Sequence, residues 1–377
     1  MKIAVLGAGL VGQAIVNDLA GIDDFTVVAA DQDVSRLESL PDEVVKIHGD
    51  LTKDEHLERV VAESEIIVNA VPGSLGFRVL KKIIEFGKNV VDIAFFPEDM
   101  KELDSLARKH GVTVVCDMGI APGMSNILAA YAAKEFHDVE RIDIYVGGLP
   151  VIRRKPYEYK APFSPADVLE EYTRPARLKI NNQIVTKAPL TDYELVDFEN
   201  IGTLEAFNTD GLRSLLDNVK ANNMTEKTLR YPGYAGKIQL LKQSGFFDEK
   251  PVEIDGAKVR PIDFTSRLLF PLWELKPGER DMTVMRVHVS GSKNNKQKSV
   301  QWNLFDEYDI SSGVHSMART TGYAATGAVK LIAEGDYTRK GVSAPEHLAE
   351  KDETVRKLLD HLEARNVVFR KSEYAGV

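Results

Sequence analysis

A glycine-rich segment near the N-terminus has the residue types and the spacing that bind an anion. Gly7-Ala8-Gly9-Leu10-Val11-Gly12 follows an apolar segment at residues 2–6 and opens a helical pattern at 10–20. In such a strand–turn–helix, the first glycine permits the tight turn, the second leaves room for a diphosphate, and the third lets the helix approach the strand. The unpaired N–H groups of the helix N-terminus then bind the diphosphate without a cation. The segment therefore predicts a dinucleotide site.

An acidic residue at the end of the next apolar segment indicates which dinucleotide is bound. Asp31 lies 19 residues after Gly12, where a carboxylate accepts hydrogen bonds from the adenosine ribose hydroxyls. Because its charge would repel a 2′-phosphate, the sequence predicts NAD rather than NADP. Arg36 is the nearest cation and would weaken that preference.

Segments after the third and fourth apolar stretches predict the remaining cofactor contacts. Asp50 and Leu51 are placed to border the adenine, although Asp50 equally suits a helix N-terminal cap. The segment Asn69-Ala70-Val71-Pro72-Gly73 follows the fourth strand at the carboxyl edge of the sheet, where open α/β folds bind ligands, and is placed to line the nicotinamide. The predicted cofactor contacts are Gly7, Gly9, Leu10, Val11, Gly12, Asp31, Asp50, Leu51, Ala70, Val71 and Pro72.

Six short apolar segments alternate with amphipathic helical patterns over the first third of the chain, as a parallel sheet with crossover helices requires. The predicted strands are residues 2–6, 26–30, 44–47, 66–69, 90–93 and 113–116. Six parallel strands are the full complement of a Rossmann domain. We therefore predict an α/β protein in which residues 1–122 form a doubly wound, NAD-binding Rossmann domain.

The pattern changes after residue 122. Residues 123–312 mix strand-like and helical segments and predict an α+β domain for substrate binding and dimerisation. An apolar strand at 283–289, followed by a polar hairpin signal at 291–295, predicts an antiparallel sheet that would serve as the surface of a homodimer. Residues 313–377 predict a C-terminal helical segment, rich in Ala, Gly and Thr at 313–332, that packs back on the Rossmann domain.

Composition argues against several classes of protein. The formal net charge is −9 and no basic block stands out, so nucleic acid is not an expected partner. No apolar run reaches the roughly 18 residues that cross a bilayer, so no membrane partner is expected. The single cysteine, Cys116, cannot form an intramolecular disulfide, and the first residues show no signal-peptide pattern, which together predict a cytoplasmic location. The histidines show no metal-site spacing, and no metal is expected.

Four segments resemble those of the saccharopine dehydrogenase-like family and occur in the family's order. They are residues 116–123, 145–150, 205–213 and 228–233. Within the family, residues 70–77, the motif Ile120-Ala121-Pro122-Gly123 and the compact length resemble lysine 6-dehydrogenase-like members. The resemblance implies an enzyme that oxidises the ε-amine of L-lysine with NAD. The product would be the 6-semialdehyde, which cyclises to piperideine-6-carboxylate, with release of ammonia.

One departure from the family pattern bears on the substrate. In saccharopine-acting members, the run that resembles Ile120-Ala121-Pro122-Gly123 is Leu-Asp-Pro-Gly. This chain therefore has Ala121 where those members have an aspartate. The departure argues against saccharopine and leaves Asp117 as the acidic group nearest the crevice on this loop. We therefore predict that Asp117, with Asp92 after the fifth strand, acts as general base on the amine or on water. For Asp92, a capping role is the alternative.

Two further residues are candidates for binding an amino-acid substrate. Arg230 offers a bidentate fork that matches an α-carboxylate, with a surface ion pair as the alternative. Tyr231 is either a hydrogen-bond donor or a packing residue. Other functions also stay open: saccharopine or carboxynorspermidine as the substrate of the same scaffold, or a non-catalytic NAD-sensing protein.

Overall fold

The computed structural model describes residues 1–161, 165–276 and 278–375, which divide into two compact units. Unit 1 comprises Met1–Glu135 and Ala318–Phe369. Unit 2 comprises Phe136–Met317 and the C-terminal strand from Arg370 onward. Within the described residues, no helix is both long enough and apolar enough to cross a membrane.

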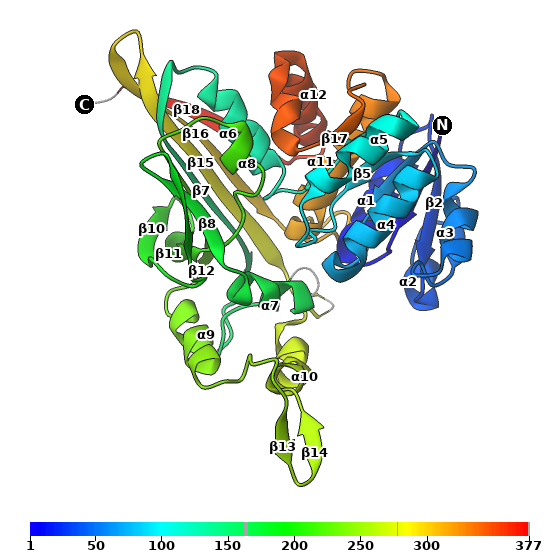
Figure 1. The fold of residues 1–377 in the computed structure, drawn as a ribbon, viewed down its shortest axis with the longest axis horizontal. Coiled ribbons are helices and arrows are strands. Elements are labelled where there is room, and N and C mark those ends of the chain that lie inside the picture. Colours follow the sequence, from blue (N-terminus) through cyan, green and yellow to red (C-terminus); the bar gives the residue numbers. More distant parts are fainter. Residues whose placement is uncertain (162–164, 277, 376–377) are drawn as a thin grey trace. The chain divides into compact units, whose positions relative to one another are not determined.

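Unit 1 is built on a seven-stranded, wholly parallel sheet (Figure 1). Its strand order is β17-β6-β5-β4-β1-β2-β3, so the order reverses beside β1 and gives the doubly wound arrangement. The strands are β1 (Lys2–Leu6), β2 (Thr26–Asp31), β3 (Val45–His48), β4 (Ile66–Asn69), β5 (Asn89–Asp92), β6 (Thr113–Val115) and β17 (Gly341–Ser343). The predicted Rossmann fold is confirmed.

The predicted strand count was wrong by one. The seventh strand, β17, comes from the C-terminal part of the chain and pairs with β6. It has only three residues, too short for a periodic pattern to reveal it. The six predicted strands are present: β1 and β4 have the predicted bounds, and the other four differ by one residue at one or both ends, which is the usual uncertainty at element boundaries.

The helices of unit 1 all contribute buried side chains to the unit. They are α1 (Leu10–Ala20), α2 (Val34–Glu38), α3 (Asp54–Val61), α4 (Gly73–Glu85), α5 (Asp104–His110), α6 (Met124–Ala133), the part of α11 (Ser316–Ala333) from Ala318 on, and α12 (Asp352–Glu363). Two glycines of α11 allow close helix packing: a Cβ on Gly322 would lie 3.2 Å from Ile15 of α1, and one on Gly327 would lie 2.9 Å from Leu358 of α12. Small residues in α11 therefore bring three helices together.

Unit 2 is an α+β unit, as predicted, but its nine-stranded sheet is mixed, whereas the sequence predicts an antiparallel sheet. The main path runs β10-β11-β12-β7-β15-β16-β18, in which β12 and β7 are parallel, and β8 and β9 extend it beside β12. The strands are β7 (Asp138–Pro150), β8 (Ala176–Ile180), β9 (Gln183–Lys187), β10 (Glu194–Phe198), β11 (Gly202–Asn208), β12 (Asn223–Arg230), β15 (Asp281–Lys293), β16 (Lys296–Glu307) and β18 (Phe369–Ala375). The helices are α7 (Pro165–Thr173), α8 (Leu215–Asn218), α9 (Tyr234–Gln243) and α10 (Pro261–Trp273).

Two hairpins shape unit 2. The predicted hairpin signal joins the long strands β15 and β16, which pair from Met282↔Glu307 to Lys293↔Lys296. Asn294 and Asn295 between them have φ of 53° and 59°, as the tight turn of a two-residue hairpin requires. A second, separate hairpin, β13 (Val252–Ile254) with β14 (Ala257–Val259), leads into α10 (Figure 1).

Candidate functional site

The glycine turn of unit 1 leaves one position open. Gly7 has φ +97°, and a Cβ there would lie 2.5 Å from the carbonyl oxygen of Ala70. A Cβ on Gly12 would overlap the carbonyl oxygen of Gly7. Gly9, the N-cap of α1, has φ −69°, and a Cβ there would meet no atom of the described chain within 4 Å. The fold itself therefore requires glycine at 7 and 12 but not at 9.

Asp31 is fixed beside this turn at the end of β2. One carboxylate oxygen accepts a hydrogen bond from the Ala8 N–H at 2.7 Å, and the other accepts one from the Asp33 N–H at 2.8 Å. A guanidinium nitrogen of the half-exposed Arg36 lies 3.8 Å from the first oxygen. A carboxylate oxygen accepts more than one hydrogen bond, so Asp31 retains acceptor capacity for a ribose hydroxyl. Arg36 lies where a cation would also reach a 2′-phosphate.

Asp50 holds the turn that follows β3. Its Oδ1 accepts hydrogen bonds from the N–H and the hydroxyl of Thr52, at 3.0 and 2.7 Å. The Thr52 hydroxyl bond is the largest of the effects that lower the pKa of Asp50. The N-cap of α3 is Lys53, so Asp50 orders the preceding turn instead of capping the helix. Leu51 is half-buried and packs against the core of unit 1.

The turn after β4 packs closely against the glycine turn. The Ala70 N–H donates to the Leu6 carbonyl at 2.9 Å, and the carbonyl of Ala70 is the atom that excludes a side chain at Gly7. Val71 is buried, and Pro72 is the N-cap residue of α4. The predicted contact segments at 7–12 and 70–72 are therefore neighbours at the carboxyl edge of the sheet.

Two buried carboxyl groups lie at the same edge, after β5 and β6. Asp92 accepts a hydrogen bond from the Asn69 side-chain amide and one from the Ala94 N–H at 2.9 Å. The Met118 N–H donates to the main-chain carbonyl of Asp92 at 2.9 Å, which ties the segment carrying Asp117 to the end of β5. Asp117 is buried, with φ +53°. The structure thus places both predicted acid–base residues in neighbouring segments of unit 1.

Asn69 is the first residue of the segment predicted to line the nicotinamide. Its amide nitrogen donates to Asp92 and to the Gly76 carbonyl, whereas its buried Oδ1 has no hydrogen-bond partner among the described residues. A buried unsatisfied acceptor costs about 1–3 kcal/mol. An acceptor of this kind suits a carboxamide or amine donor of a bound ligand.

Arg230 of unit 2 is buried at the end of β12 and lies in a ring of aromatic and acidic groups. Its Nη2 is 3.2 Å from a carboxylate oxygen of Glu171 and 3.3 Å from the Tyr172 hydroxyl, and its guanidinium lies 4.3 Å from the centre of the Tyr159 ring. Its Nη1 donates to the Leu229 carbonyl. The Nε has no hydrogen-bond acceptor within the described part of the chain. The structure therefore gives Arg230 an internal ion pair.

Tyr231 has an internal partner as well. Its hydroxyl donates to the Pro150 carbonyl at 2.9 Å, and the guanidinium of Arg153 lies 4.4 Å from the ring centre. Burial raises the pKa of the hydroxyl. Tyr231 thus joins the end of β12 to the end of β7.

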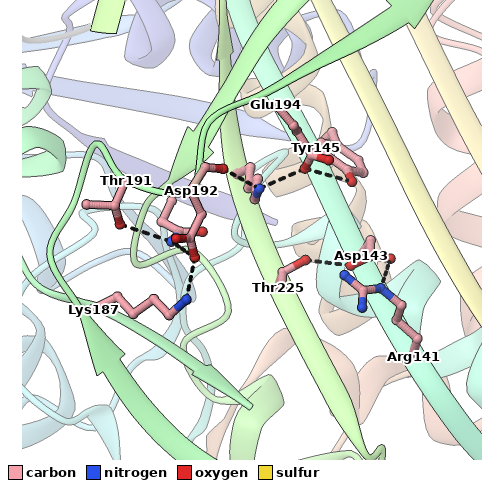
Figure 2. A network of polar contacts seen from close by, with 10 residues as sticks. Arg141, Asp143, Tyr145, Lys187, Thr191, Asp192, Glu194 and Thr225 are labelled. Atoms are coloured by element: carbon pink, nitrogen blue, oxygen red, sulfur yellow. Dashed lines mark hydrogen bonds and ion pairs between the residues drawn. The ribbon is translucent and has the colours of Figure 1, made fainter. Parts of the chain in front are cut away.

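One face of the unit 2 sheet carries a network of paired charges (Figure 2). The hydroxyl of Tyr145 donates to Glu194 at 3.1 Å, and Lys227 lies 2.8 Å from the same carboxylate and donates to the main-chain carbonyl of Asp192. Nearby, Thr225 and Arg141 both donate to Asp143. Burial, followed by the charge of Asp143, raises the pKa of Tyr145. These groups satisfy one another within the unit.

Sequence reasoning missed two acidic residues of unit 2. Glu171 of α7 is the ion-pair partner of Arg230, and nothing in its local pattern points to that contact. Glu226 of β12 is buried, and its carboxylate accepts hydrogen bonds from the Thr209 hydroxyl at 2.7 Å and the Gly211 N–H at 3.0 Å. Burial raises its pKa to about 7. Across the described ranges, no group of three or more His, Cys, Asp or Glu could hold a metal ion.

Comparison with known families decides what the two units are. Residues 3–115 match the saccharopine dehydrogenase NADP binding domain, and residues 119–368 match the saccharopine dehydrogenase C-terminal domain. The chain belongs to the saccharopine dehydrogenase family. It is accordingly an oxidoreductase whose N-terminal domain is of a nicotinamide-dinucleotide-binding type.

Relatives and a solved structure agree with this assignment. The chain is 22% identical to the saccharopine dehydrogenase [NADP(+), L-glutamate-forming] of Saccharomyces cerevisiae over 431 positions, covering 95% of this chain and 97% of the relative. It is also 22% identical to the carboxynorspermidine synthase of Vibrio cholerae, with 92% of each chain covered. The bovine mitochondrial alpha-aminoadipic semialdehyde synthase is 24% identical, and this chain spans 45% of its length. The apo saccharopine dehydrogenase structure from yeast shares the fold, with a TM-score of 0.82, 21% identity and coverage of 99% and 100%.

The residues of unit 1 fit a nicotinamide dinucleotide. Gly9 leaves space at a helix N-terminus for a diphosphate, Asp31 stands where the adenosine ribose would bind, and the unsatisfied Asn69 Oδ1 lies at the carboxyl edge of β4. The same site carries Arg36 next to Asp31. This saccharopine dehydrogenase family member therefore has the groups to hold the cofactor, including a cation beside the ribose position.

Proposed function

We propose that this family member oxidises the ε-amine of L-lysine to the 6-semialdehyde, using NAD in preference to NADP. Ring closure of the semialdehyde gives piperideine-6-carboxylate, and the nitrogen leaves as ammonia. The observation that carries the proposal is the pair of buried carboxyl groups, Asp92 and Asp117, in segments that lie at the same sheet edge as the glycine turn. Such a pair suits general base catalysis, in which a carboxylate removes a proton from the substrate amine or from water.

The chemistry requires the ε-ammonium group of lysine to lose one proton before hydride transfer. Hydride leaves the carbon only when the attached nitrogen is neutral, yet lysine arrives charged with a pKa of about 10.4. Neutralising that amine at pH 7 costs roughly 4 to 5 kcal/mol, at about 1.4 kcal/mol per pH unit. Bound nicotinamide supplies the hydride acceptor. Asp117 accepts the amine proton and releases it to solvent. It then takes a proton from the water that attacks the imine carbon and returns it to the nitrogen, which leaves as ammonia. Asp92 positions the segment that carries Asp117.

Two features favour lysine over a larger amine. Ala121 occupies the position before the proline, where saccharopine-acting members have an aspartate. This chain therefore lacks a carboxylate that could bind a second charged group of a larger substrate. The alignment with the yeast relative needs 431 positions, more than the 377 residues of this chain, so that relative carries insertions that this chain lacks. A shorter chain with fewer charges on that loop suits a smaller substrate.

NAD is favoured because the Asp31 carboxylate, at the end of β2, would accept hydrogen bonds from the adenosine ribose and repel a 2′-phosphate. The rival observation is Arg36, 3.8 Å from Asp31, together with the NADP named for the matching domain and for the yeast relative. That rival points to a second candidate function, an NADP-dependent dehydrogenase acting on saccharopine or carboxynorspermidine.

A substrate panel separates the two candidates. Purified chain would be assayed by absorbance of the reduced nicotinamide with L-lysine, saccharopine and carboxynorspermidine, each with NAD and with NADP. The proposal expects turnover of L-lysine with NAD, rising with pH as more of the amine becomes neutral. Turnover of saccharopine or carboxynorspermidine with NADP, and none of lysine, would establish the second candidate instead. Tight NAD binding without turnover of any amine would indicate a sensing protein.

A further inference from the structure

Glu226, a buried residue of β12 in unit 2, takes no part in the reaction described above. Its two hydrogen-bond donors, the Thr209 hydroxyl and the Gly211 N–H, both contact the same carboxylate oxygen, Oε2. Across the described ranges, no residue donates to Oε1 and no cation pairs with this carboxylate. A buried carboxylate without a cation costs folding free energy. Glu226 is therefore a candidate for binding a ligand.

The surrounding loop holds the carboxyl group of Glu226 in one position. The Thr209 hydroxyl has one hydrogen and donates it to Glu226 at 2.7 Å, so the Thr228 hydroxyl, 2.9 Å away, donates to Thr209. A Cβ on Gly211 would lie 2.4 Å from the carboxyl carbon of Glu226. Residues 209–211 thus give a hydroxyl, an amide and the space of a missing side chain to this one group, and they leave Oε1 for another donor.

The neighbouring acidic groups have cations of their own. Burial is the main cause that raises the pKa of Glu226 to about 7, and the charges of Glu171 and Asp210 add to it. Glu171 forms an ion pair with Arg230, and Asp210 forms one with Arg177. Glu226 has no such partner among the described residues. The local charge at Oε1 therefore favours a cationic ligand.

An ammonium group is the cation that suits this position. It has three hydrogen-bond donors and needs fewer acidic ligands than a metal ion, and no group of three or more His, Cys, Asp or Glu among the described residues could hold a metal. Thr209, Asp210, Glu226 and Thr228 each keep 3–8% of their surface exposed. The group therefore borders space that a small molecule can reach.

We infer that Glu226 binds the α-ammonium group of the amino-acid substrate through Oε1, an inference that rests on the proposed function. In that reaction the ε-amine must lose its proton, whereas a neighbouring carboxylate keeps the α-ammonium charged. Hydrogen bonds between two charged groups are stronger than neutral ones. Glu226 thereby distinguishes an α-amino acid from an amine of the same length without taking part in proton transfer.

The first test compares two ligands that differ only at the α-carbon. 6-Aminohexanoate has the carboxylate and the terminal amine of L-lysine, with a hydrogen in place of the α-ammonium group. Calorimetric titration into the wild-type chain with NADH present measures binding without turnover. L-Lysine is expected to bind about tenfold more tightly or better, as the loss of a charge-assisted hydrogen bond implies. Equal Kd values would overturn the inference, and this comparison needs no variant.

The second test removes the charge of Glu226. Glu226→Gln keeps the size of the side chain and an acceptor for Thr209 and Gly211, but it places an amide –NH₂ at the position of Oε1. The Kd for L-lysine is expected to rise roughly 10- to 100-fold, while the Kd for 6-aminohexanoate stays within about twofold. A purely structural role would weaken both ligands alike. A folded variant that keeps its preference for L-lysine would overturn the inference.

Asp143→Asn is the matched control. The Asp143 carboxylate is also buried, and it accepts hydrogen bonds from Thr225 and Arg141 (Figure 2). Thr225 and Glu226 are adjacent on β12, so their side chains point to opposite faces of the sheet. The control therefore removes a buried charge from the other face and should leave both Kd values unchanged. Thermal melts confirm that both variants fold.

The proposed function and this inference fail separately. If the wild-type chain prefers L-lysine through Glu226 but does not oxidise it with NAD, the proposed reaction is wrong and the inference stands. If the wild-type chain oxidises L-lysine while Glu226→Gln binds it equally tightly, the inference is wrong and the reaction stands. A wild-type chain that does not bind L-lysine also overturns the inference.

Discussion

The glycine turn of unit 1 and the Arg230 cluster of unit 2 are both polar sites at the end of a buried strand, yet they differ in what they leave unfilled. At the turn, a Cβ on Gly9 would meet no atom within 4 Å in the described chain. The Asn69 Oδ1 accepts no hydrogen bond from any described residue. At the cluster, the guanidinium of Arg230 already has a carboxylate, hydroxyls and an aromatic ring around it. A site built for a ligand shows groups that the fold does not need, whereas the Arg230 cluster satisfies most of its own groups and leaves the Nε without an acceptor among the described residues.

The largest expected effect is on catalysis at Asp117. Asp117→Asn keeps a residue type that tolerates the positive φ of 53°, so the fold should be retained while the proton acceptor is lost. We expect kcat with L-lysine and NAD to fall by about 10² to 10⁴-fold, with little change in the KM for NAD. Steady-state kinetics from neutral to alkaline pH measure this. Wild-type kcat throughout that range would remove Asp117 from the mechanism.

The next effect concerns stability and sharpens the contrast within the glycine turn. Gly12→Ala pushes a Cβ into the Gly7 carbonyl and is expected to cost about 1–3 kcal/mol or more of unfolding free energy, as overpacking does. Gly9→Ala adds a Cβ in open space at an ordinary φ and should cost less, about 0.5–1 kcal/mol, the N-cap difference between the two residues. Urea unfolding of both variants measures the difference. Equal losses would mean that position 9 is also filled by the fold.

Most of the glycine turn could be predicted from the sequence because its parts are local. The strand, turn and helix are continuous from Lys2 to Ala20, and Asp31 is reached by the next strand. By contrast, the partner of Arg230 is Glu171, 59 residues away on a helix, and no local pattern encodes that contact. The strand β17 has three residues and pairs with β6 from more than 220 residues away, which periodicity alone does not reveal. Local motifs predicted the cofactor side, and long-range packing left the substrate side open.

A third prediction asks whether the Arg230 cluster is more than internal. Arg230→Lys retains the positive charge but loses the planar fork. If Arg230 binds the substrate α-carboxylate, KM for L-lysine should rise about tenfold or more while the melting temperature falls little. If its role is the ion pair with Glu171, the melting temperature should fall and KM should stay near wild type. We expect the second outcome, because the guanidinium already has Glu171, Tyr172 and Tyr159 as partners. Kinetics paired with thermal melts distinguish the two.

The smallest predicted effect is a pH response of opposite sign in the two units. In unit 1, burial lowers the pKa of His361 to about 3, helped by Arg365. Its unfolded form takes up a proton below about pH 6.5, so unit 1 loses stability as the pH falls. In unit 2, the raised pKa of Glu226 means that the folded form holds a proton that the unfolded form has lost between about pH 4.5 and 7. Unit 2 therefore gains stability as the pH falls.

Variants isolate these two contributions. Between about pH 6.5 and 5, each group changes the free energy of unfolding by up to about 1 kcal/mol per pH unit. Relative to wild type, His361→Gln should therefore become more stable as the pH falls, and Glu226→Gln should become more stable as it rises. Melting temperatures of the three proteins across this range measure both trends. Parallel curves for all three would show that neither group titrates as its burial implies.

The measurement that bears most directly on the whole account is calorimetric titration of NAD into the wild-type chain and into Gly9→Ala. The account predicts that NAD binds to wild type, more tightly than NADP. It also predicts that Gly9→Ala raises the Kd for NAD by roughly tenfold or more, because the added methyl group occupies the space left for the diphosphate, while the melting temperature falls by much less than in Gly12→Ala. Identical titrations of the two proteins, or no binding of either dinucleotide by wild type, would contradict it.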